Sequence, residues 1–129
     1  MTDHPADFVL VVDDDPTLRR LIEEALAFEG YRIEAAGTTA EALATVDAGP
    51  PHVIVLDMKM PDDGSRFQSE LKRRSLNAPI VAMSASREGP RWAAQIGAHA
   101  FLAKPFDVDD LTAAVDSAFA ANGGRRPPE

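Results

Sequence analysis

The chain of 129 residues contains no cysteine, which excludes a disulfide framework, a zinc-thiolate site and a thiol redox motif. It is also short of positive charge. Thirteen basic side chains stand against 21 acidic ones, and the net charge of −8 disfavours nucleic acids and anionic membranes as partners. The N-terminal segment has neither the basic nor the apolar region of a signal peptide, and no apolar run approaches the roughly 18 residues of a membrane span. We therefore expect one cytoplasmic domain with no nucleic-acid or membrane partner.

Two short apolar runs each end in acid. Phe8–Val12 leads into Asp13 and Asp14, and Val53–Leu56 leads into Asp57. Runs of this length that are β-branched and apolar on both faces are typical of buried parallel strands, and ligands bind beyond the carboxyl ends of such strands. If the two strands are neighbours, each pair of carboxylates at about 5 Å repels by about 3 kcal/mol at an effective dielectric of about 20. The cluster therefore predicts a bound cation.

Hydrophobic runs alternate with amphipathic stretches along the whole chain, which predicts a doubly wound α/β domain. We expect about five parallel strands flanked by about five helices, in flavodoxin-like order. The domain is expected over 8–121, after an N-terminal extension of 1–7 and before a flexible tail of 122–129. The expected strands are 8–12, 31–35, 52–56, 79–83 and 100–103, and the expected helices are about 16–29, 39–47, 65–74, 90–97 and 108–121.

Capping signals mark the ends of the first and last helices. Asp15 is a good N-cap and Pro16 a good first residue for the first helix, and Leu21 belongs to its expected buried face. For the last helix, Asp107 is the expected N-cap, and Val108 belongs to the expected buried face.

The third and fourth helices are signalled less clearly. The Pro-Asp-Asp-Gly segment at 61–64 predicts a turn-rich loop before the third helix, which is expected to bury Phe67 and Leu71. In the fourth helix we expect Trp92 to pack against Ile96 one turn further on, rather than to form an exposed anchor for a partner.

Four of the expected strands end in polar residues. In addition to the acids, Ser84 follows the fourth strand and Lys104 follows the fifth. In a doubly wound sheet these ends share one edge, so carboxylates, a hydroxyl and an ammonium surround a single crevice. Magnesium prefers one or two carboxylates together with phosphate oxygens and water, and lysine supplies a point charge for a phosphate. The pattern predicts a phosphoryl site with magnesium (Mg2+), in which Asp57 is the nucleophile.

The chain resembles the receiver domain of two-component response regulators, of the stand-alone type found in chemotaxis regulators. The resemblance covers essentially residues 8–121, and the motifs are specific because they occur in order at the right spacings. The segments that carry it are Val12-Asp13-Asp14-Asp15, Asp57-x-x-Met60-Pro61, Ser84-Ala85, Gly97-Ala98 and Phe101-Leu102-x-Lys104-Pro105-Phe106.

This resemblance implies a phosphoacceptor for signal transduction rather than an enzyme acting on outside substrates. Asp57 would accept a phosphoryl group from a histidine kinase or a histidine phosphotransfer protein, and a downstream effector of unknown identity would respond. The resemblance also implies that Asp14, Asp57 and the backbone carbonyl of Lys59 bind Mg2+ directly, while Asp13 acts mostly through water.

The resemblance further implies a switch and a cis peptide bond. The Ser84 hydroxyl would turn to the phosphoryl group, the Phe101 ring would rotate inward, and Lys104 would pair with the phosphate. The bond between Lys104 and Pro105 would be cis, and proline is the residue that makes such a bond accessible. Serine and phenylalanine replace the threonine and tyrosine more common in the family, so a looser switch is expected.

Two lengths depart from the family pattern. The loop at 61–64 is about one residue short, and the stretch from Ser84 to Lys104 is about two residues short, with Gly89 and Pro90 where the fourth helix normally begins. We therefore expect a shortened or displaced fourth helix, on the face that would signal to a partner.

Two alternatives stay open. The first is a receiver that docks its partner regardless of phosphate. The second is a Mg2+-dependent aspartyl-phosphate phosphatase of the haloacid dehalogenase type, although such enzymes place an acid where this chain has Lys59. A flavodoxin is excluded because the loop after its first strand must cradle phosphate, and here that loop is acidic.

Overall fold

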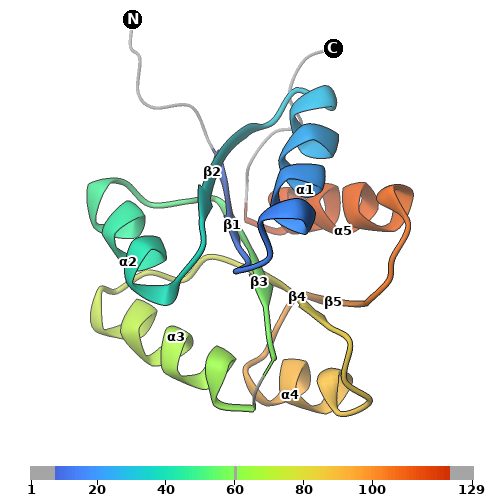
Figure 1. Cartoon of the computed structure of the whole chain (residues 1–129). Coiled ribbons are helices and arrows are strands. Elements are labelled where there is room, and N and C mark those ends of the chain that lie inside the picture. Colours follow the sequence, from blue (N-terminus) through green and yellow to red (C-terminus); the bar gives the residue numbers. More distant parts are fainter. Residues whose placement is uncertain (1–7, 60, 123–129) are drawn as a thin grey trace, which may run out of the picture.

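The computed structural model describes residues 8–59 and 61–122, in which five strands and five helices alternate (Figure 1). Met60, the N-terminal segment 1–7 and the tail from 123 lie outside the described residues. The strands are β1 (Phe8–Val12), β2 (Arg32–Ala36), β3 (Val53–Asp57), β4 (Ile80–Ser84) and β5 (Ala100–Ala103). The helices are α1 (Pro16–Phe28), α2 (Thr39–Ala48), α3 (Pro61–Arg73), α4 (Gly89–Gln95) and α5 (Val108–Ala121).

The strands form one parallel sheet in the order β2-β1-β3-β4-β5. This is the flavodoxin-like order that the sequence predicts. The three central strands are almost wholly buried, whereas the edge strands β2 and β5 are partly exposed. The strand order reverses between the neighbours β1 and β3, and a ligand crevice is expected beyond the carboxyl ends of strands at such a reversal.

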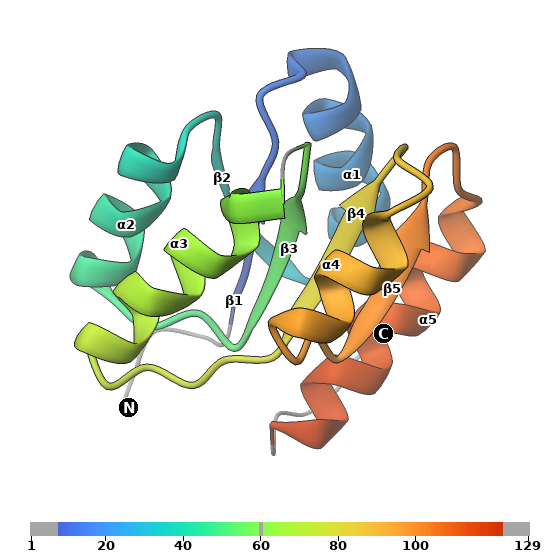
Figure 2. The same cartoon turned by 90° about the horizontal axis from the view of Figure 1, so that it is seen from below.

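Helices cover both faces of the sheet. In Figures 1 and 2, α1 and α5 lie together on one face, and α2, α3 and α4 cover the other. Side chains alternate along each strand, so Val9 and Val11 of β1 join the core under α1 and α5, while Leu10 and Val12 join the other core. The apolar runs are continuous because both faces of the sheet are buried.

The predicted first cap is confirmed. The Asp15 side chain accepts hydrogen bonds from the backbone N–H groups of Thr17 and Leu18, at 3.0 and 3.3 Å, and Pro16 is the first helical residue. These bonds satisfy donors that have no partner within the helix. The cap begins α1 directly after the acids that follow β1, which holds this loop in place.

Helix α3 begins at Pro61, four residues earlier than predicted. The predicted turn at 61–64 is therefore wrong, because proline and aspartate favour the first turn of a helix as well as a loop. Gly64 is buried, and a Cβ atom there would lie 2.8 Å from Met58 Cε and 2.9 Å from Ile96 Cδ1. The missing side chain lets the start of α3 approach the end of α4.

Two apolar side chains predicted to be buried are exposed. Leu21 is 48% exposed and Val108 is 42% exposed. The sheet-facing side of α1 is filled by Ile22 and Leu26, which lie one turn apart, and Leu21 lies about 100° around the helix from Ile22. Asp107 precedes α5 as predicted, but its side chain makes no capping hydrogen bond.

Helix α4 has seven residues, from Gly89 to Gln95, close to the short helix predicted at 90–97. Trp92 is 9% exposed and joins the same core as Ile96, which confirms the predicted packing. Phe67 and Leu71 of α3 are buried in that core too, as predicted. Within the described residues, none of the helices is long and apolar enough to cross a bilayer.

Candidate phosphoryl and metal site

The carboxyl ends of β1 and β3 bring three acidic side chains together. Asp57 is the last residue of β3, and Asp13 and Asp14 follow β1. Val12 pairs with Leu56, so the chain leaves the two strands at the same level of the sheet. One carboxylate oxygen from each aspartate lies within 4.8 Å of the others. The predicted convergence of the acids is confirmed.

These acids line a cleft of about 270 Å³. The Asp13 side chain is 0% exposed and that of Asp57 is 6% exposed, whereas that of Asp14 is 60% exposed. The cleft is therefore open to solvent at Asp14 and closed behind the other two acids. Its lining residues are Val12, Asp13, Asp14, Gly37, Thr38, Thr39, Leu56, Asp57 and Lys59.

Lys104 reaches the cluster from the end of β5. Its ammonium donates to Asp57 Oδ1 at 2.7 Å and to Asp13 Oδ2 at 3.4 Å. The peptide bond between Lys104 and Pro105 is cis, and the Lys104 backbone N–H donates to the Ser84 carbonyl at 2.9 Å. The Lys104 side chain is only 18% exposed, so water competes weakly for the buried carboxylates that it contacts.

A second ammonium lies on the open side of the cluster. Lys59 Nζ is 2.6 Å from Asp14 Oδ1 and 3.9 Å from Asp57 Oδ2. The two lysines therefore lie next to different oxygens of Asp57. Lys104 is hydrogen-bonded to Oδ1, and Lys59 is nearer to Oδ2. Because the Lys59 side chain is 54% exposed, its ion pair with Asp14 is accessible to water and ions.

These contacts shift the pKa values of the acids in opposite directions. The Lys59 hydrogen bond lowers the pKa of Asp14 below its ordinary value of 3.8. Burial raises the pKa of Asp57 above 3.8, with Lys104 opposing the rise and the charge of Asp13 adding to it. The ionised form of Asp14 is therefore stabilised, whereas the ionised form of Asp57 is destabilised by burial.

Ser84, Gly89 and Phe101 meet beside the cluster. Ser84 is 2% exposed, and its hydroxyl oxygen accepts a hydrogen bond from the Ser86 backbone N–H at 3.0 Å. Phe101 is partly buried and packs on the core under α2, α3 and α4. A Cβ atom on Gly89 would lie 2.7 Å from Phe101 Cζ and 2.9 Å from Ser84 Cβ. The first residue of α4 thus touches both predicted switch residues.

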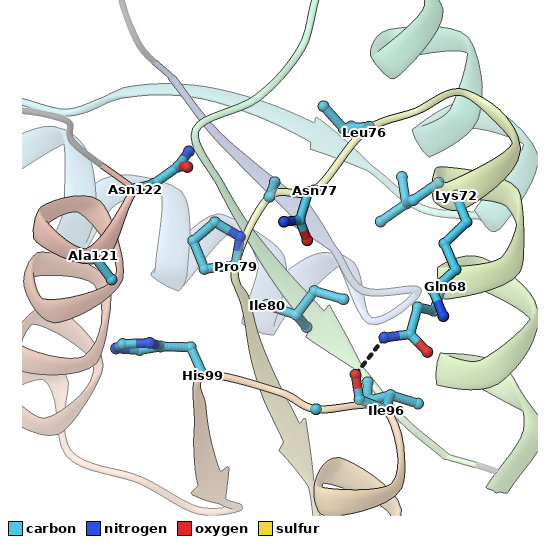
Figure 3. A pocket seen from close by; sticks show the side chains of 13 residues that line it. Gln68, Lys72, Leu76, Asn77, Pro79, Ile80, Ile96, His99, Ala121 and Asn122 are labelled. Carbon is cyan, nitrogen blue, oxygen red and sulfur yellow. Dashed lines mark hydrogen bonds between the residues drawn. The ribbon is translucent and has the colours of Figure 1, made fainter.

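A separate cavity of about 310 Å³ lies at the opposite end of the strands, away from the acids (Figure 3). It is lined by residues at the start of β4, such as Pro79 and Ile80, and by residues near the ends of α3 and α5. The Gln68 side chain donates a hydrogen bond to the Ile96 carbonyl at its edge. This cavity contains none of the predicted site residues.

Comparison with known proteins agrees with this geometry. The family model described as "Response regulator receiver domain" matches residues 9–116. The chain belongs to this family. Receiver domains are the phosphoacceptors of two-component signalling and not classical enzymes, which disfavours the phosphatase alternative. The match includes four strands completely, β1 from its second residue, and all the residues of the acid and lysine cluster.

Relatives of this receiver domain include longer regulators. The DNA-binding transcriptional regulator NtrC of Escherichia coli is 35% identical over 113 residues, which are 85% of this chain and 24% of NtrC. The KDP operon transcriptional regulatory protein KdpE of Escherichia coli is 32% identical over 123 residues, covering 94% of this chain and 55% of KdpE. The chain thus spans about a quarter to about half of these curated relatives.

Among solved structures, the Vibrio cholerae chemotaxis protein CheY4 superposes with a TM-score of 0.77 at 28% identity, covering 88% of this chain and 99% of CheY4. The receiver domain of NtrX from Brucella abortus has a TM-score of 0.78 at 29% identity, covering 87% of this chain and 98% of that one. The five-stranded parallel fold is therefore shared with these receiver domains.

The donor set of this receiver domain fits magnesium. Asp13, Asp14 and Asp57 offer only oxygen ligands, which suit a hard cation, and the open side of the cleft leaves room for water. The position of the Lys59 ammonium against Asp14 indicates that positive charge is favoured there.

Two contacts of the receiver domain were not predicted from sequence. The contact of the Lys59 ammonium with Asp14 has no local signal, because these two residues follow different strands. The approach of Gly89 to Phe101 has none either, because these residues lie on different elements.

Proposed function

We propose that this receiver domain accepts a phosphoryl group on Asp57 from a histidine kinase or a histidine phosphotransfer protein, with Mg2+, and then changes the face that it presents to an effector protein. The observation that carries the proposal is the position of Asp57. Its carboxylate is nearly buried at the end of β3, yet it lines an open cleft and lies between two ammonium groups. A cytoplasmic location follows from the intracellular kinases that this role requires.

Asp57 is the acid best suited to attack phosphorus. Asp13 Oδ1 already accepts a hydrogen bond from the Asp15 backbone N–H at 2.8 Å, and Asp14 is held by Lys59. Asp57 Oδ2 lies 3.9 Å from Lys59 Nζ, beyond hydrogen-bond distance, and burial raises the pKa of this carboxyl. A more basic carboxylate with an oxygen facing the cleft is the better nucleophile.

In the reaction, an oxygen of Asp57 attacks the phosphorus of a phosphohistidine. A phosphorus–oxygen bond forms, the phosphorus–nitrogen bond breaks, and its electron pair stays on the histidine. Bound Mg2+ supplies charge neutralisation for the phosphoryl oxygens, and Asp13, Asp14, Asp57 and the Lys59 carbonyl are the residues that would hold it. Lys104 keeps one oxygen of Asp57 oriented and afterwards neutralises the product.

The response would pass through Ser84, Phe101 and α4. The Ser84 hydroxyl oxygen accepts a hydrogen bond from the Ser86 backbone N–H, and the oxygens of a phosphoryl group on Asp57 would be strong acceptors for the hydroxyl proton of Ser84. Phe101 lies against Gly89, so movement of the ring changes the packing around the first residue of α4. Coupling of this kind is typically worth about 1 to 3 kcal/mol, which biases an equilibrium between two conformations.

The test is incubation with acetyl phosphate and MgCl2, followed by intact mass measurement and peptide mapping. We expect one phosphoryl adduct on the peptide that contains Asp57, and none for Asp57→Asn. Asp47→Asn, which removes a carboxylate on α2, is the matched control and should still form the adduct.

An adduct of equal yield in Asp57→Asn would overturn the proposal. A wild-type adduct that leaves partner binding unchanged would favour the phosphate-independent docking receiver instead. Sustained turnover of an added phosphate ester would favour the phosphatase.

A further inference from the structure

We propose that the Lys59 ammonium is an internal competitor of Mg2+: it occupies the cation position between Asp14 and Asp57 in the metal-free protein, and the metal must displace it. The inference rests on the proposed function only in taking these two acids as metal ligands. It assigns Lys59 a side-chain role that is separate from its backbone carbonyl.

The contacts of Lys59 show where its ammonium and Mg2+ would compete. Its Nζ atom is 2.6 Å from Asp14 Oδ1 and 3.9 Å from Asp57 Oδ2, so it lies between oxygens of two expected ligands. A cation bound to the same two carboxylates would meet the ammonium at close range, and the like charges repel. The ion pair and the metal are therefore alternatives at this position.

Lys104 does not compete in the same way. It contacts Asp57 through Oδ1 and Asp13 through Oδ2, on the buried side of the cluster, and its side chain is 18% exposed. The open side, where a hydrated ion enters, is the side of Asp14 and Lys59. The cluster thus contains one lysine in the closed part of the site and one in the path of the metal.

Exposure sets the strength of the competition. Because the side chains of Lys59 and Asp14 are 54% and 60% exposed, the ammonium can move into water, and the buried carboxylate of Asp57 keeps its ion pair with Lys104. The competing ion binds only to molecules in which the ion pair is open. If the exposed pair is open in about one fifth of the molecules, the apparent affinity for the ion is about fivefold lower. Lys59 weakens Mg2+ binding and does not prevent it.

The experiment is a calorimetric titration of MgCl2 into the full chain, stripped with EDTA, at constant ionic strength. Lys59→Met keeps the length of the side chain and removes its charge, and it should tighten Mg2+ binding about fivefold. Lys59→Arg keeps the charge and should stay close to wild type. Lys72→Met removes an exposed lysine at the end of α3, remote from the cleft, and controls for the change in net charge.

An unchanged or weaker affinity in Lys59→Met, or an equal gain in Lys72→Met, would overturn the inference. The outcome is distinguishable from failure of the proposed function. If acetyl phosphate modifies Asp57 while the three variants bind Mg2+ alike, only the competition is wrong. If Lys59→Met binds Mg2+ more tightly while no adduct forms on Asp57, the competition holds and the phosphoacceptor role fails.

Discussion

At the scale of single residues, the site depends on charges held close together at different depths. Asp13 and Asp57 are buried beside one ammonium, and Asp14 is exposed beside another. The direction of each pKa shift follows from the surroundings of the side chain. Burial raises the pKa of Asp57, whereas at the exposed Asp14 the ion pair with Lys59 lowers the pKa. Neighbouring acids of the same type therefore suit different roles.

Gly89 belongs to this scale because one missing side chain decides whether Phe101 can keep its position. A Cβ atom in Gly89→Ala would lie 2.7 Å from Phe101 Cζ, so the ring has to move. We expect the variant to lose about 1 to 3 kcal/mol of unfolding free energy through overpacking and to shift the aromatic NMR signals of Phe101. Urea denaturation and NMR measure the two effects.

The control for this prediction is Gly49→Ala. No atom lies within 4 Å of a Cβ placed on Gly49, and its φ of 178° is ordinary extended backbone. The Gly49 variant should leave both stability and the Phe101 signals close to wild type. Equal behaviour of the two variants would show that Gly89 does not hold the ring in place.

At the scale of elements, Arg74 links α2 to the end of α3. It donates to Asp47 Oδ1 at 2.7 Å and to Glu70 Oε1 at 2.8 Å. The hydrogen bonds from Arg74 lower the pKa of both carboxyls, from ordinary values of 3.8 and 4.5. Since the folded-state pKa values are lowered, this contribution to stability is present above the ordinary values and is lost as the pH falls through the lowered ones.

Arg74→Met should therefore melt at a lower temperature than wild type at pH 7. The difference should begin to shrink as the pH falls below the ordinary values of 4.5 and 3.8, and it should vanish only below the lowered folded-state pKa values, where both carboxyls are protonated in the folded protein. Thermal unfolding followed by circular dichroism over a pH series measures it. Arg91→Met, which breaks a more exposed pair between α4 and the residue just before it, Glu88, should show a smaller effect. A difference for Arg74→Met that persisted at acid pH would point to lost packing instead of lost charge.

At the scale of the whole molecule, one sheet separates two cores that share the same strands. Phe67 lies in the core under α2, α3 and α4, and Phe119 lies in the core under α1 and α5. Because alternate residues of each strand belong to different cores, neither layer can be lost while the other keeps its sheet. The single tryptophan, Trp92, reports on the core that contains Phe67.

We expect Phe67→Ala and Phe119→Ala each to lose about 3 to 5 kcal/mol of unfolding free energy. In Phe119→Ala, Trp92 fluorescence and far-ultraviolet circular dichroism should report the same urea midpoint, although the change is on the other face of the sheet. Phe28→Ala is the control, because Phe28 is 89% exposed and its loss should change stability by about 0.5 kcal/mol or less. A fluorescence midpoint that stayed at the wild-type value would show that the two cores unfold separately.

The order and type of the elements follow from local patterns. Apolar runs such as Phe8–Val12 and caps such as Asp15 report on their own neighbourhood, and the parallel arrangement then brings the strand ends to one edge. The start of α3 and the exposure of Leu21 were predicted wrongly, because proline and aspartate suit both turns and helix starts, and because neighbouring elements decide which part of an apolar face is covered.

The sequence by itself determined the fold class, the family and the convergence of Asp13, Asp14 and Asp57, since each depends on residues at the ends of recognisable strands. Only the tertiary structure decided how deep each acid lies, that the Lys59 ammonium contacts Asp14, and that Gly89 touches Phe101. Depth and contact depend on loops and helices packed from distant parts of the chain, and no local pattern of residues encodes those distances.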